Sequence, residues 1–403
     1  MKFLPQVEVK IAAKLANQGF SLFQNLQKQQ KKAIWRNVCF VSDEKIWASC
    51  SQFFDKFLYD LELAGIDYRV LILKDAQPDE KNLALLKKQN CDLMIALGSG
   101  VISDLCKFVS AQKKVPYIIF PSAPSMNGYL SKNASLLIAG HKKTVPATLP
   151  LAVFADLEIL KTAPKNLIQA GIGDSLCFYS CWFDWLLSHF VLGTKFDEKS
   201  FKIAKNKIDF LIKNYSKFSL NDDKLLKILT EILLLSGAAM TMAQGSYPAS
   251  QSEHLIAHAF EMKYPKKAHK IFHGLQIATT TLTSLKMQRE LANKGLLQIT
   301  KNEFSEKNLA KFFNKKIATS CKKEYLAKIN FDEKKINNTL KSSWSKQQKI
   351  LQKILFDEKT LKKILKHFKI KTSPKALDLS AQQYQDLVNN AKFIRNRFTC
   401  LDL

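Results

Sequence analysis

Glycine, arginine and paired cysteines are scarce in this chain of 403 residues. The eight cysteines include no Cys-x-x-Cys pair, which disfavours a structural zinc knuckle and a thioredoxin-type redox motif. They are also too few to form a disulfide scaffold in a chain of this length. We therefore expect a reducing compartment in which most thiols are buried as small hydrophobic groups.

Arginine is the rare base in a strongly basic composition. Lysine and arginine together number 62 against 35 acidic residues, a formal net charge of +27, yet only five are arginines: Arg36, Arg69, Arg289, Arg395 and Arg397. A nucleic-acid binder would use arginine for bidentate contacts, with aromatic residues interleaved for stacking. Because neither pattern is present, we expect a lysine-rich solvated surface and no nucleic-acid partner. The charge still attracts an anionic substrate over a distance.

A long hydrophobic run is absent as well. The longest apolar stretch, residues 232–243, contains Ser236, Gly237 and Thr241 and is too short to span a bilayer, so it predicts a buried core helix. The first twenty residues mix lysine and glutamate with apolar residues and lack the apolar segment of a signal peptide. We therefore expect no membrane span and a soluble protein in the cytoplasm.

The composition is otherwise that of a folded protein, with 46% hydrophobic and 24% charged residues. The length predicts two or three domains. Up to about Asp156, short apolar runs typical of strands alternate with helical stretches, which predicts a parallel sheet with right-handed crossovers. The predicted strands are 37–41, 68–73, 93–97, 117–120 and 151–154, and the predicted helices between them include 44–62, 80–88 and 102–111.

The second half of the chain has a different texture. A hairpin is predicted from residues 136–138 and a polar tip at 140–143, and strand signals vanish after Leu160. Helical apolar spacing then covers 168–190, 226–243, 252–262 and 275–291, with lysine-rich amphipathic helices to the end. We predict an α/β dinucleotide-binding domain over residues 1–160 and an all-helical, metal- and substrate-binding domain over residues 161–403, packed on a shared cleft.

The few glycines are concentrated in one region. Six of the thirteen (Gly98, Gly100, Gly128, Gly140, Gly171 and Gly173) lie between residues 98 and 173, which indicates positive φ or close approach to a ligand. The first two flank Ser99 where a predicted strand meets a helix, and there the backbone amides and the helix N-terminus favour a diphosphate. A plain tight turn is an equal alternative. The Gly-x-Gly-x-x-Gly fingerprint is absent, so an ordinary Rossmann domain is not supported.

A second candidate segment follows the next predicted strand. Residues 121–131 read Pro-Ser-Ala-Pro-Ser-Met-Asn-Gly-Tyr-Leu-Ser. The carboxyl ends of neighbouring parallel strands share one edge of the sheet, where open α/β folds bind ligands. Hydroxyl and glycine residues also form turns that bind nothing, but the predicted placement favours a binding role.

Four of the seven histidines lie between residues 254 and 273. His254 and His258 are four residues apart and therefore share one helix face. His273 starts another predicted helix, and Asp174 follows a Gly-Ile-Gly segment. One carboxylate with two or three imidazoles suits Zn²⁺, Fe²⁺ or Ni²⁺ with a position left open for substrate. The alternative is that His254 and His258 are surface or satisfied core histidines. The motif is not His-Glu-x-x-His, which excludes a zincin protease.

Motifs along nearly the whole chain carry a resemblance to a known family. They include Ala-Pro-Ser-Met at 123–126, Ala-Gly-Ile-Gly-Asp at 170–174, Pro-Ala-Ser followed by Ser-Glu-His at 248–254, His-Gly at 273–274, and Ile-Arg-Asn-Arg-Phe-Thr at 394–399. In this order they resemble the sn-glycerol-1-phosphate dehydrogenase family, within the superfamily of iron-containing alcohol dehydrogenases, glycerol dehydrogenase and 3-dehydroquinate synthase.

The resemblance implies a dehydroquinate-synthase-like fold and the reversible reduction of dihydroxyacetone phosphate to sn-glycerol 1-phosphate by NADH or NADPH. It implies one divalent metal, with Zn²⁺ first and Ni²⁺ or Fe²⁺ as alternatives, and a homo-oligomer. The implied metal ligands are Asp174, His254 and His273. Asn127, Asp174 and His258 would face the substrate, a triose phosphate. The dinucleotide would lie along Gly98, Ser99, Gly100, Val101, Ile102, Ser122, Ala123, Pro124 and Ser125, with Ser131 near it.

Elementary chemistry agrees with this reaction. Hydride delivered to a ketone leaves negative charge on the carbonyl oxygen, which a metal with an open position stabilises as a Lewis acid. The oxygen then needs a proton. We expect His258 to supply it, directly or through water, because it lies one turn from His254 and imidazole ordinarily titrates near neutral pH. Asp174 and His258 are therefore the expected catalytic residues.

Four positions depart from the family pattern. Asn127 stands where the family usually has Asp, Tyr247 where it has Arg, Gln251 where it has Gly, and Ser99 where it has a middle Gly. The alternative enzyme is a divergent polyol or glycerol dehydrogenase acting on an unphosphorylated or different ketone, which Tyr247 favours. A non-catalytic nucleotide-binding relative is a further alternative, which Asn127 favours. The choice between NADH and NADPH stays open, because Lys74 and Asp75, which follow the second predicted strand, offer opposite charges where the ribose would lie.

Overall fold

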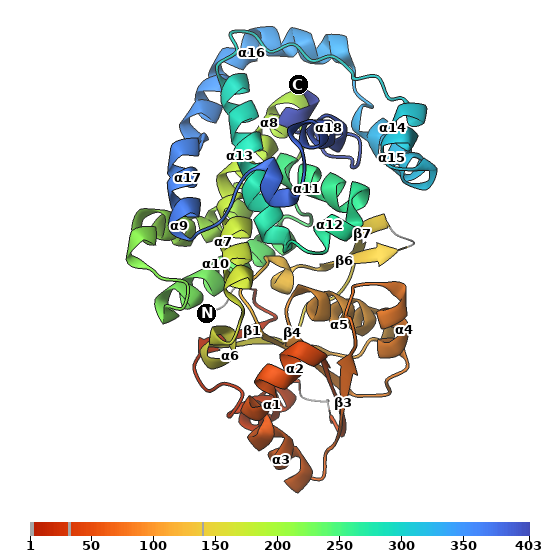
Figure 1. Cartoon of the computed structure of the whole chain (residues 1–403), viewed down its shortest axis with the longest axis vertical. Helices are drawn as coiled ribbons and strands as arrows, with labels where there is room; N and C mark the ends of the chain where they lie inside the picture. Colours follow the sequence, from red (N-terminus) through yellow and green to blue (C-terminus); the bar gives the residue numbers. More distant parts are fainter. Residues whose placement is uncertain (1–3, 31–33, 139–140) are drawn as a thin grey trace. The chain divides into compact units, whose positions relative to one another are not determined.

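The computed structural model describes residues 4–30, 34–138 and 141–403 (Figure 1). The chain forms two compact units. Unit 1 comprises Met1–Gly171 with Lys217–Thr241, and unit 2 comprises Ile172–Ser216 with Met242–Leu403. This partition follows the contacts of the chain and crosses the predicted domains 1–160 and 161–403, which stay a prediction.

Unit 1 is built on a six-stranded parallel sheet with the strand order β1-β8-β5-β4-β2-β3. All five strands that the sequence predicts are present, and β1 was not predicted. A parallel sheet buried by helices explains why β4 is apolar and buried along its whole length. The strands are β1 (Glu8–Ala12), β2 (Asn37–Asp43), β3 (Asp67–Leu73), β4 (Leu93–Gly98), β5 (Tyr117–Pro121) and β8 (Ala152–Asp156).

Seven helices of unit 1 accompany this sheet in the described part of the chain: α1 (Gly19–Gln29), α2 (Glu44–Cys50), α3 (Asp55–Leu63), α4 (Glu80–Lys87), α5 (Gly100–Lys113), α6 (Leu157–Lys161) and α10 (Asp223–Met242). The single helix predicted over residues 44–62 was wrong, since a 3₁₀ turn at Ser51–Phe53 divides it into α2 and α3. The Ser49 hydroxyl donates back to the carbonyls of Lys45 and Ile46 at this point. Serines compete with helical hydrogen bonds in this way and favour helix ends.

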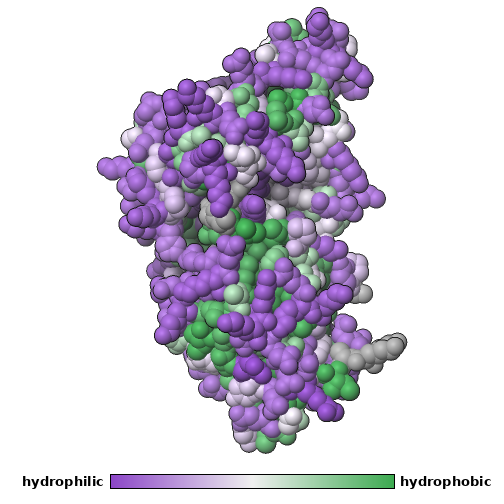
Figure 2. All heavy atoms as spheres, turned by 90° about the vertical axis from the view of Figure 1, so that its right-hand side faces the viewer, coloured by the Kyte–Doolittle hydropathy of each residue, from purple (hydrophilic) through white to green (hydrophobic). Residues whose placement is uncertain are grey.

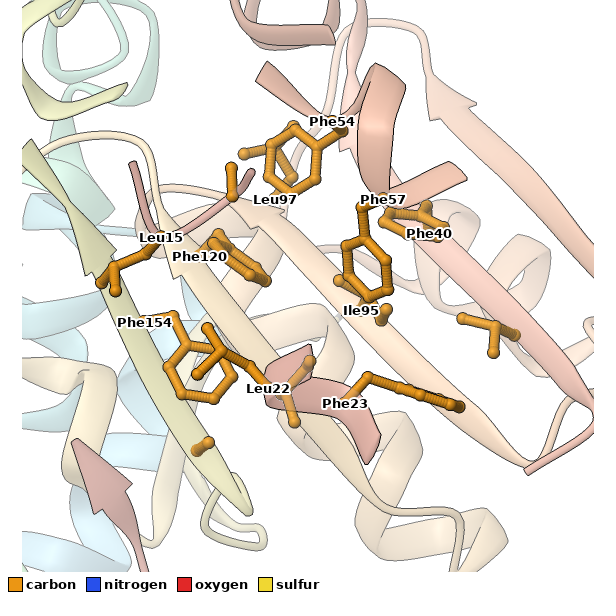
Figure 3. Close-up of a cluster of buried hydrophobic side chains, with 14 of the residues drawn as sticks. Leu15, Leu22, Phe23, Phe40, Phe54, Phe57, Ile95, Leu97, Phe120 and Phe154 are labelled. Atoms are coloured by element: carbon orange, nitrogen blue, oxygen red, sulfur yellow. The ribbon is translucent and has the colours of Figure 1, made fainter. Parts of the chain in front are cut away.

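Aromatic rings fill the core on one face of the sheet (Figure 3). Phe54 of the α2–α3 connection packs edge-on against Phe120 of β5, with ring centres 5.0 Å apart. Phe120 in turn lies 5.4 Å from Phe154 of β8, and Phe40 of β2 lies 5.6 Å from Phe57 of α3. Because every second side chain of a strand points to the same face of the sheet, one alternating set of strand residues supplies this core layer.

The predicted hairpin is confirmed. Strands β6 (Asn133–Ile138) and β7 (His141–Pro146) pair antiparallel. Gly140, predicted at its tip, lies outside the described residues. The predicted core helix is longer than its apolar stretch, since α10 has 20 residues. By length and composition alone α10 is apolar enough to cross a membrane, but 67% of its most apolar window is buried inside the protein, as in the core helix of a soluble protein.

Unit 2 is helical. In the part of the chain that the structure describes, no strand follows Asp156, as predicted. The helix predicted over residues 168–190 is two helices, because the backbone at Cys177 has ψ near −6° in place of the helical value and α8 begins anew after it. The helices are α7 (Lys165–Leu176), which continues from unit 1, α8 (Phe178–Leu192), α9 (Glu198–Asn214), α11 (Ser252–Lys263), α12 (Pro265–Ala268), α13 (His273–Ala292), α14 (Glu306–Phe312), α15 (Lys315–Lys328), α16 (Glu333–Ile354), α17 (Glu358–His367) and α18 (Ala381–Ala391).

The surface is mostly hydrophilic on the face that Figure 2 shows, as the many lysines predict. Two lysines among the described residues are exceptions, since Lys107 and Lys328 are buried. All eight cysteines are free and buried, which confirms the prediction that the thiols act as core residues.

Candidate functional site

The first candidate segment forms the turn from β4 into α5. A side chain at Gly98 would meet Ile102 at 2.5 Å, so the turn requires a glycine there. Ser99 has φ of −95°, which any residue adopts, so replacing the family's middle glycine by serine strains nothing. No side chain caps the start of α5. The first amides of a helix lack partners within it and are suited to a phosphate.

The second candidate segment lies beside the first, as predicted. Strands β4 and β5 are neighbours, with Gly98 in register with Pro121, and the Ser122 amide donates to the Gly98 carbonyl at 3.1 Å. Both segments therefore leave the same carboxyl edge of the sheet. Within the second, the Tyr129 hydroxyl donates to the Ala123 carbonyl at 2.7 Å, which closes the loop on itself.

A buried lysine that the sequence analysis missed fixes this loop. Lys107 of α5 is fully buried, and its ammonium donates to the Gly128 carbonyl at 2.6 Å and lies 3.3 Å from Asp104. Asp104 also accepts from the Ser135 amide at 3.2 Å. Burial lowers the pKa of Lys107 and raises that of Asp104. One sequence signal could have revealed Lys107. Asp104 precedes it by three residues, so the two opposite charges lie on the same face of a largely apolar helix.

Two further predicted residues belong to this loop. Asn127 is partly buried, and a side chain at Gly237 of α10 would meet the Asn127 carbonyl oxygen at 2.5 Å. Helix α10 therefore approaches the loop backbone through a glycine. Ser131 is buried, and its hydroxyl accepts from the Asn133 amide at 3.2 Å. The structure thus gathers Gly98–Ile102 and Ser122–Ser125 at one edge of the unit 1 sheet, with Ser131 further along the second loop. The role of these residues stays a prediction.

The predicted metal ligands converge within unit 2. Asp174 comes from α7, His254 from α11 and His273 from the first turn of α13, and one ligand atom from each lies within 4.8 Å of the others. His254 Nε2 is 3.5 Å from Asp174 Oδ1. Glycines make this possible, because a side chain at Gly173 would meet the Gly274 carbonyl at 2.1 Å. The backbones of α7 and α13 therefore approach closely beside Asp174 and His273.

His258 lies beside the same group. Its ring stacks on that of His273, with centres 5.5 Å apart and planes inclined by 13°. His258, Glu261 and His273 also bring one ligand atom each within 4.8 Å of one another. Asp174, His254 and His258 are buried, whereas the side chain of His273 retains 28% of its exposure. His273 is thus the member of the group most open to a ligand from outside.

Two carboxylates that the sequence analysis did not assign orient the histidines. Glu253 Oε1 lies 2.9 Å from His254 Nδ1, and Glu261 Oε1 lies 3.1 Å from His273 Nδ1. Each bond leaves the other ring nitrogen to serve as a ligand, which is the carboxylate–histidine arrangement found behind protein-bound metals. The spacing offered a signal for Glu261, which follows His258 by three residues on the same helix face.

The donor set fits a divalent cation. Although burial acts to lower it, hydrogen bonds to Asp174 and Glu253 raise the pKa of His254 to about 10. The imidazole therefore sits where positive charge is stabilised. One carboxylate oxygen and two imidazole nitrogens with oriented rings match the ligands that Zn²⁺, Ni²⁺ and Fe²⁺ accept.

Comparison with known proteins connects the chain to a family. Residues 19–164 match a family model described as iron-containing alcohol dehydrogenase. The chain is 34% identical over 235 residues to the glycerol-1-phosphate dehydrogenase (NAD(P)+) of Bacillus subtilis, covering 57% of this chain and 59% of that protein. It is 30% identical over 283 residues to the enzyme of the same name from Bacillus velezensis, covering 68% and 71%. The chain thus spans about three fifths of the length of the first of these relatives.

A solved structure shows the same fold. The probable glycerol dehydrogenase of Sinorhizobium meliloti superposes with a TM-score of 0.63 at 16% identity, covering 96% of this chain and 87% of that one. A likeness at this identity concerns the fold alone. It confirms the predicted dehydroquinate-synthase-like class, with an α/β N-terminal part and a helical C-terminal part.

Proposed function

The chain belongs to the glycerol-1-phosphate dehydrogenase family, and on that premise we propose that it is a metal-dependent, NAD(P)-linked oxidoreductase. Its proposed reaction is the reversible reduction of dihydroxyacetone phosphate to sn-glycerol 1-phosphate. The observation that carries the proposal is the convergence of Asp174, His254 and His273, with Glu253 and Glu261 behind the two histidines. Histidines that bind no metal have no reason to converge with a carboxylate from another helix or to have their rings oriented by further carboxylates.

Asp174, His254 and His273 would hold the metal. When bound, a divalent cation supplies positive charge that stabilises an oxygen on which negative charge develops. Glu253 and Glu261 fix the tautomers of the two imidazoles by accepting from Nδ1. Asp174 contributes the anionic ligand from a buried position.

The proton for the reduced oxygen is proposed to come from a ring nitrogen of His258. This residue lies one turn along α11 from His254, and its ring is stacked on that of His273. His258 lies next to the ligand group Asp174, His254 and His273 but is not one of its members, which suits a proton donor. His258 and Asp174 are accordingly the proposed catalytic residues.

The dinucleotide is proposed to bind at the carboxyl edge of the unit 1 sheet. The amides at the start of α5, from Gly100 to Ile102, suit its diphosphate because no side chain caps them. The neighbouring loop, Ser122–Ser125 with Ser131, would complete the site, and Asn127 is proposed to face the substrate. NADH and NADPH both remain candidates for the hydride donor.

One specific observation favours a second function. Tyr247 stands where the family has Arg, and a tyrosine cannot bind a phosphate group by charge. If no lysine of this chain replaces that arginine, the enzyme would reduce an unphosphorylated ketone, as a polyol dehydrogenase.

The test is a substrate screen on chain stripped with a chelator and reconstituted with Zn²⁺, Ni²⁺ or Fe²⁺. NADH and NADPH oxidation is followed with dihydroxyacetone phosphate and with dihydroxyacetone. The proposal predicts turnover that requires metal and a kcat/KM at least about tenfold higher for the phosphorylated ketone, roughly 1.4 kcal/mol of transition-state binding. Equal rates on both ketones would establish the polyol reaction instead. Metal without turnover on any ketone would leave a binding protein.

A further inference from the structure

A pair of thiols lies behind the proposed metal centre. Cys177 precedes α8 and Cys181 follows one turn later, with their sulfur atoms 3.8 Å apart. Cys181 Sγ is 3.1 Å from Glu253 Oε1, and Cys177 Sγ is 3.1 Å from the Asp174 carbonyl. Both cysteines are buried, at 2% exposure or less. Nothing in the proposed dehydrogenase reaction uses these sulfurs.

We propose that Cys177, Cys181, Glu253 and His254 form a second metal site, specific for a thiophilic cation such as Zn²⁺ or Cd²⁺. One ligand atom from each of the four residues lies within 4.8 Å of the others, and all four residues are buried. The site uses ligand atoms that the first site does not, and filling it replaces the hydrogen bond between His254 Nδ1 and Glu253 Oε1.

The separation between the two sulfurs matches tetrahedral coordination. A cation with metal–sulfur bonds of about 2.3 Å holds two sulfurs about 3.8 Å apart in a tetrahedral site, and Cys177 and Cys181 are separated by 3.8 Å. The nitrogen–oxygen edge, from His254 Nδ1 to Glu253 Oε1, is 2.9 Å. The tetrahedral value for that edge is about 3.3 Å. The edge from Cys181 Sγ to Glu253 Oε1 is 3.1 Å, against a tetrahedral value of about 3.6 Å. The Glu253 oxygen would therefore have to move away from both Cys181 and His254 to admit the cation.

The Glu253 carboxylate is already held in the orientation that the site needs. The Ser180 hydroxyl donates to Glu253 Oε2 at 2.9 Å, and the Gln288 amide donates to the Ser180 hydroxyl at 3.1 Å. Glu253 Oε1 faces Cys181 and His254 and also accepts from the Gln251 amide at 2.8 Å. An outer layer of hydrogen bonds that fixes a ligand oxygen is characteristic of built metal sites.

His254 gives one ring nitrogen to each site. Nε2 faces Asp174 at 3.5 Å, while Nδ1 faces Glu253 at 2.9 Å. The two sites therefore do not compete for the same atom of the ring. With Nε2 given to the first site, cation binding at the second site releases to solvent the thiol protons of Cys177 and Cys181 and the Nδ1 proton, which leaves His254 as an imidazolate.

A neighbouring cation offsets part of the remaining charge. Two thiolates, one carboxylate and the His254 imidazolate exceed the charge of one divalent metal by two negative units, and the imidazolate charge is shared with the metal of the first site. Burial lowers the pKa of Arg397. The negative charges of Cys181 and Glu253 are among those that raise it again. Arg397 donates to the Ser250 carbonyl, in the segment just before α11, and its positive charge favours the filled site.

The experiment titrates the full chain, reduced and stripped of metal, with CdCl₂. Thiolate-to-cadmium charge-transfer absorption in the ultraviolet reports sulfur ligation, and bound cadmium is counted after desalting. We expect two cadmium ions per chain, with the absorption rising for one of them. The double variant Cys177→Ser, Cys181→Ser should lose the absorption and one ion. Cys321→Ser, which changes a buried cysteine of α15, should keep both.

His273→Ala separates this proposal from the proposed function. It removes a ligand of the first site and none of the second, so it should lose one ion and retain the full absorption. Cys177→Ala alone should lose about half of the absorption, which keeps the test valid if the double variant folds poorly. Absence of the absorption in the unchanged chain, or its persistence in the double variant, would overturn the second site.

Discussion

The guanidinium carbon of Arg397 lies 4.0 Å from the centre of the Tyr247 ring. The Trp185 ring stacks on the same tyrosine, with centres 5.6 Å apart and planes inclined by 21°. Arg397 also donates to the Ser250 carbonyl and, at 3.1 Å, to the Ser246 hydroxyl. Tyr247, which replaces the family's arginine, therefore packs between Trp185 and Arg397. These contacts hold the segment that leads into α11 and its two histidines.

Removing the Tyr247 ring should destabilise the protein while removing only its hydroxyl should not. Tyr247→Ala loses an aromatic stack and a cation–π contact, for which we expect a loss of about 1–3 kcal/mol in the free energy of unfolding. Tyr247→Phe keeps both contacts and should cost less than about 0.5 kcal/mol. Urea denaturation at matched pH measures the difference. Equal stabilities of the Ala and Phe variants would show that the stack contributes nothing.

Glu261, the carboxylate behind His273, should tune metal affinity at the first site without being one of its ligands. His273→Ala should abolish binding at the first site and lower kcat at least about a thousandfold, the loss of one transition-state charge contact. Glu261→Gln should weaken metal binding about 10–100-fold and allow rescue of activity at high metal concentration. Isothermal titration and steady-state kinetics measure both effects.

The exposed His189 of α8 supplies the matched control for these variants. His189→Ala removes an imidazole from unit 2 outside every ligand group, so its metal content and kcat should equal those of the unchanged chain. A Glu261→Gln variant with unchanged metal affinity would assign Glu261 a purely structural contact with His273.

The strands and the ligand group were predictable because their signals are local. Buried parallel strands such as β4 are continuous apolar runs, and Asp174, His254 and His273 stand in motifs of a known family. The convergence of these three residues is set by the close approach of α7 and α13 through Gly173. A family motif carries that tertiary information, whereas residue spacing does not.

The missed features depend on what side chains meet after folding. β1 is a short edge strand in which the charged residues Glu8 and Lys10 alternate with apolar ones, so it lacks an apolar run. The breaks at Ser51 and Cys177 lie within continuous helical patterns, where one residue's hydrogen bond or ψ decides the outcome. Lys107 looked like a surface lysine, because only the folded loop supplies the Gly128 carbonyl that buries it.

Lys107 and Asp104 should behave as a buried ion pair whose halves cannot be removed separately. Lys107→Met leaves Asp104 without its cation and frees the Gly128 carbonyl, so we expect a loss of about 3–5 kcal/mol in the free energy of unfolding. Asp104→Asn combined with Lys107→Met should cost less than the sum of the single changes. A double-mutant cycle by chemical denaturation measures this coupling.

An exposed pair on α3 provides the comparison for this cycle. Lys56 and Asp60 are 2.8 Å apart, with the lysine side chain 62% exposed. Lys56→Met should therefore change stability by less than about 1 kcal/mol. Similar losses for Lys56→Met and Lys107→Met would contradict the assignment of Lys107 as the anchor of the loop.

Asp184 should give the stability of the protein a pH dependence that Asp184→Asn removes. Burial, followed by the negative charge of Glu253, raises the pKa of this carboxyl from 3.8 to about 7. The folded chain then keeps a proton that the unfolded chain releases above about pH 4. The contribution of Asp184 to stability is complete below that pH and falls as pH rises toward 7, by at most about 1.4 kcal/mol per pH unit.

Urea denaturation of both proteins between pH 4 and pH 8 checks this sign. Asp184 accepts from the amides of Cys400 at 3.0 Å and Ser252 at 3.2 Å, one through each oxygen. An asparagine turns its NH₂ toward one of these donors, which costs a constant amount at every pH. The advantage of the unchanged chain over Asp184→Asn should therefore shrink from pH 4 to pH 7 and then level off, because the carboxyl is ionised in both states above its folded pKa. Parallel stability curves would mean that Asp184 is ionised in the folded protein throughout, with its charge stabilised by the two amides.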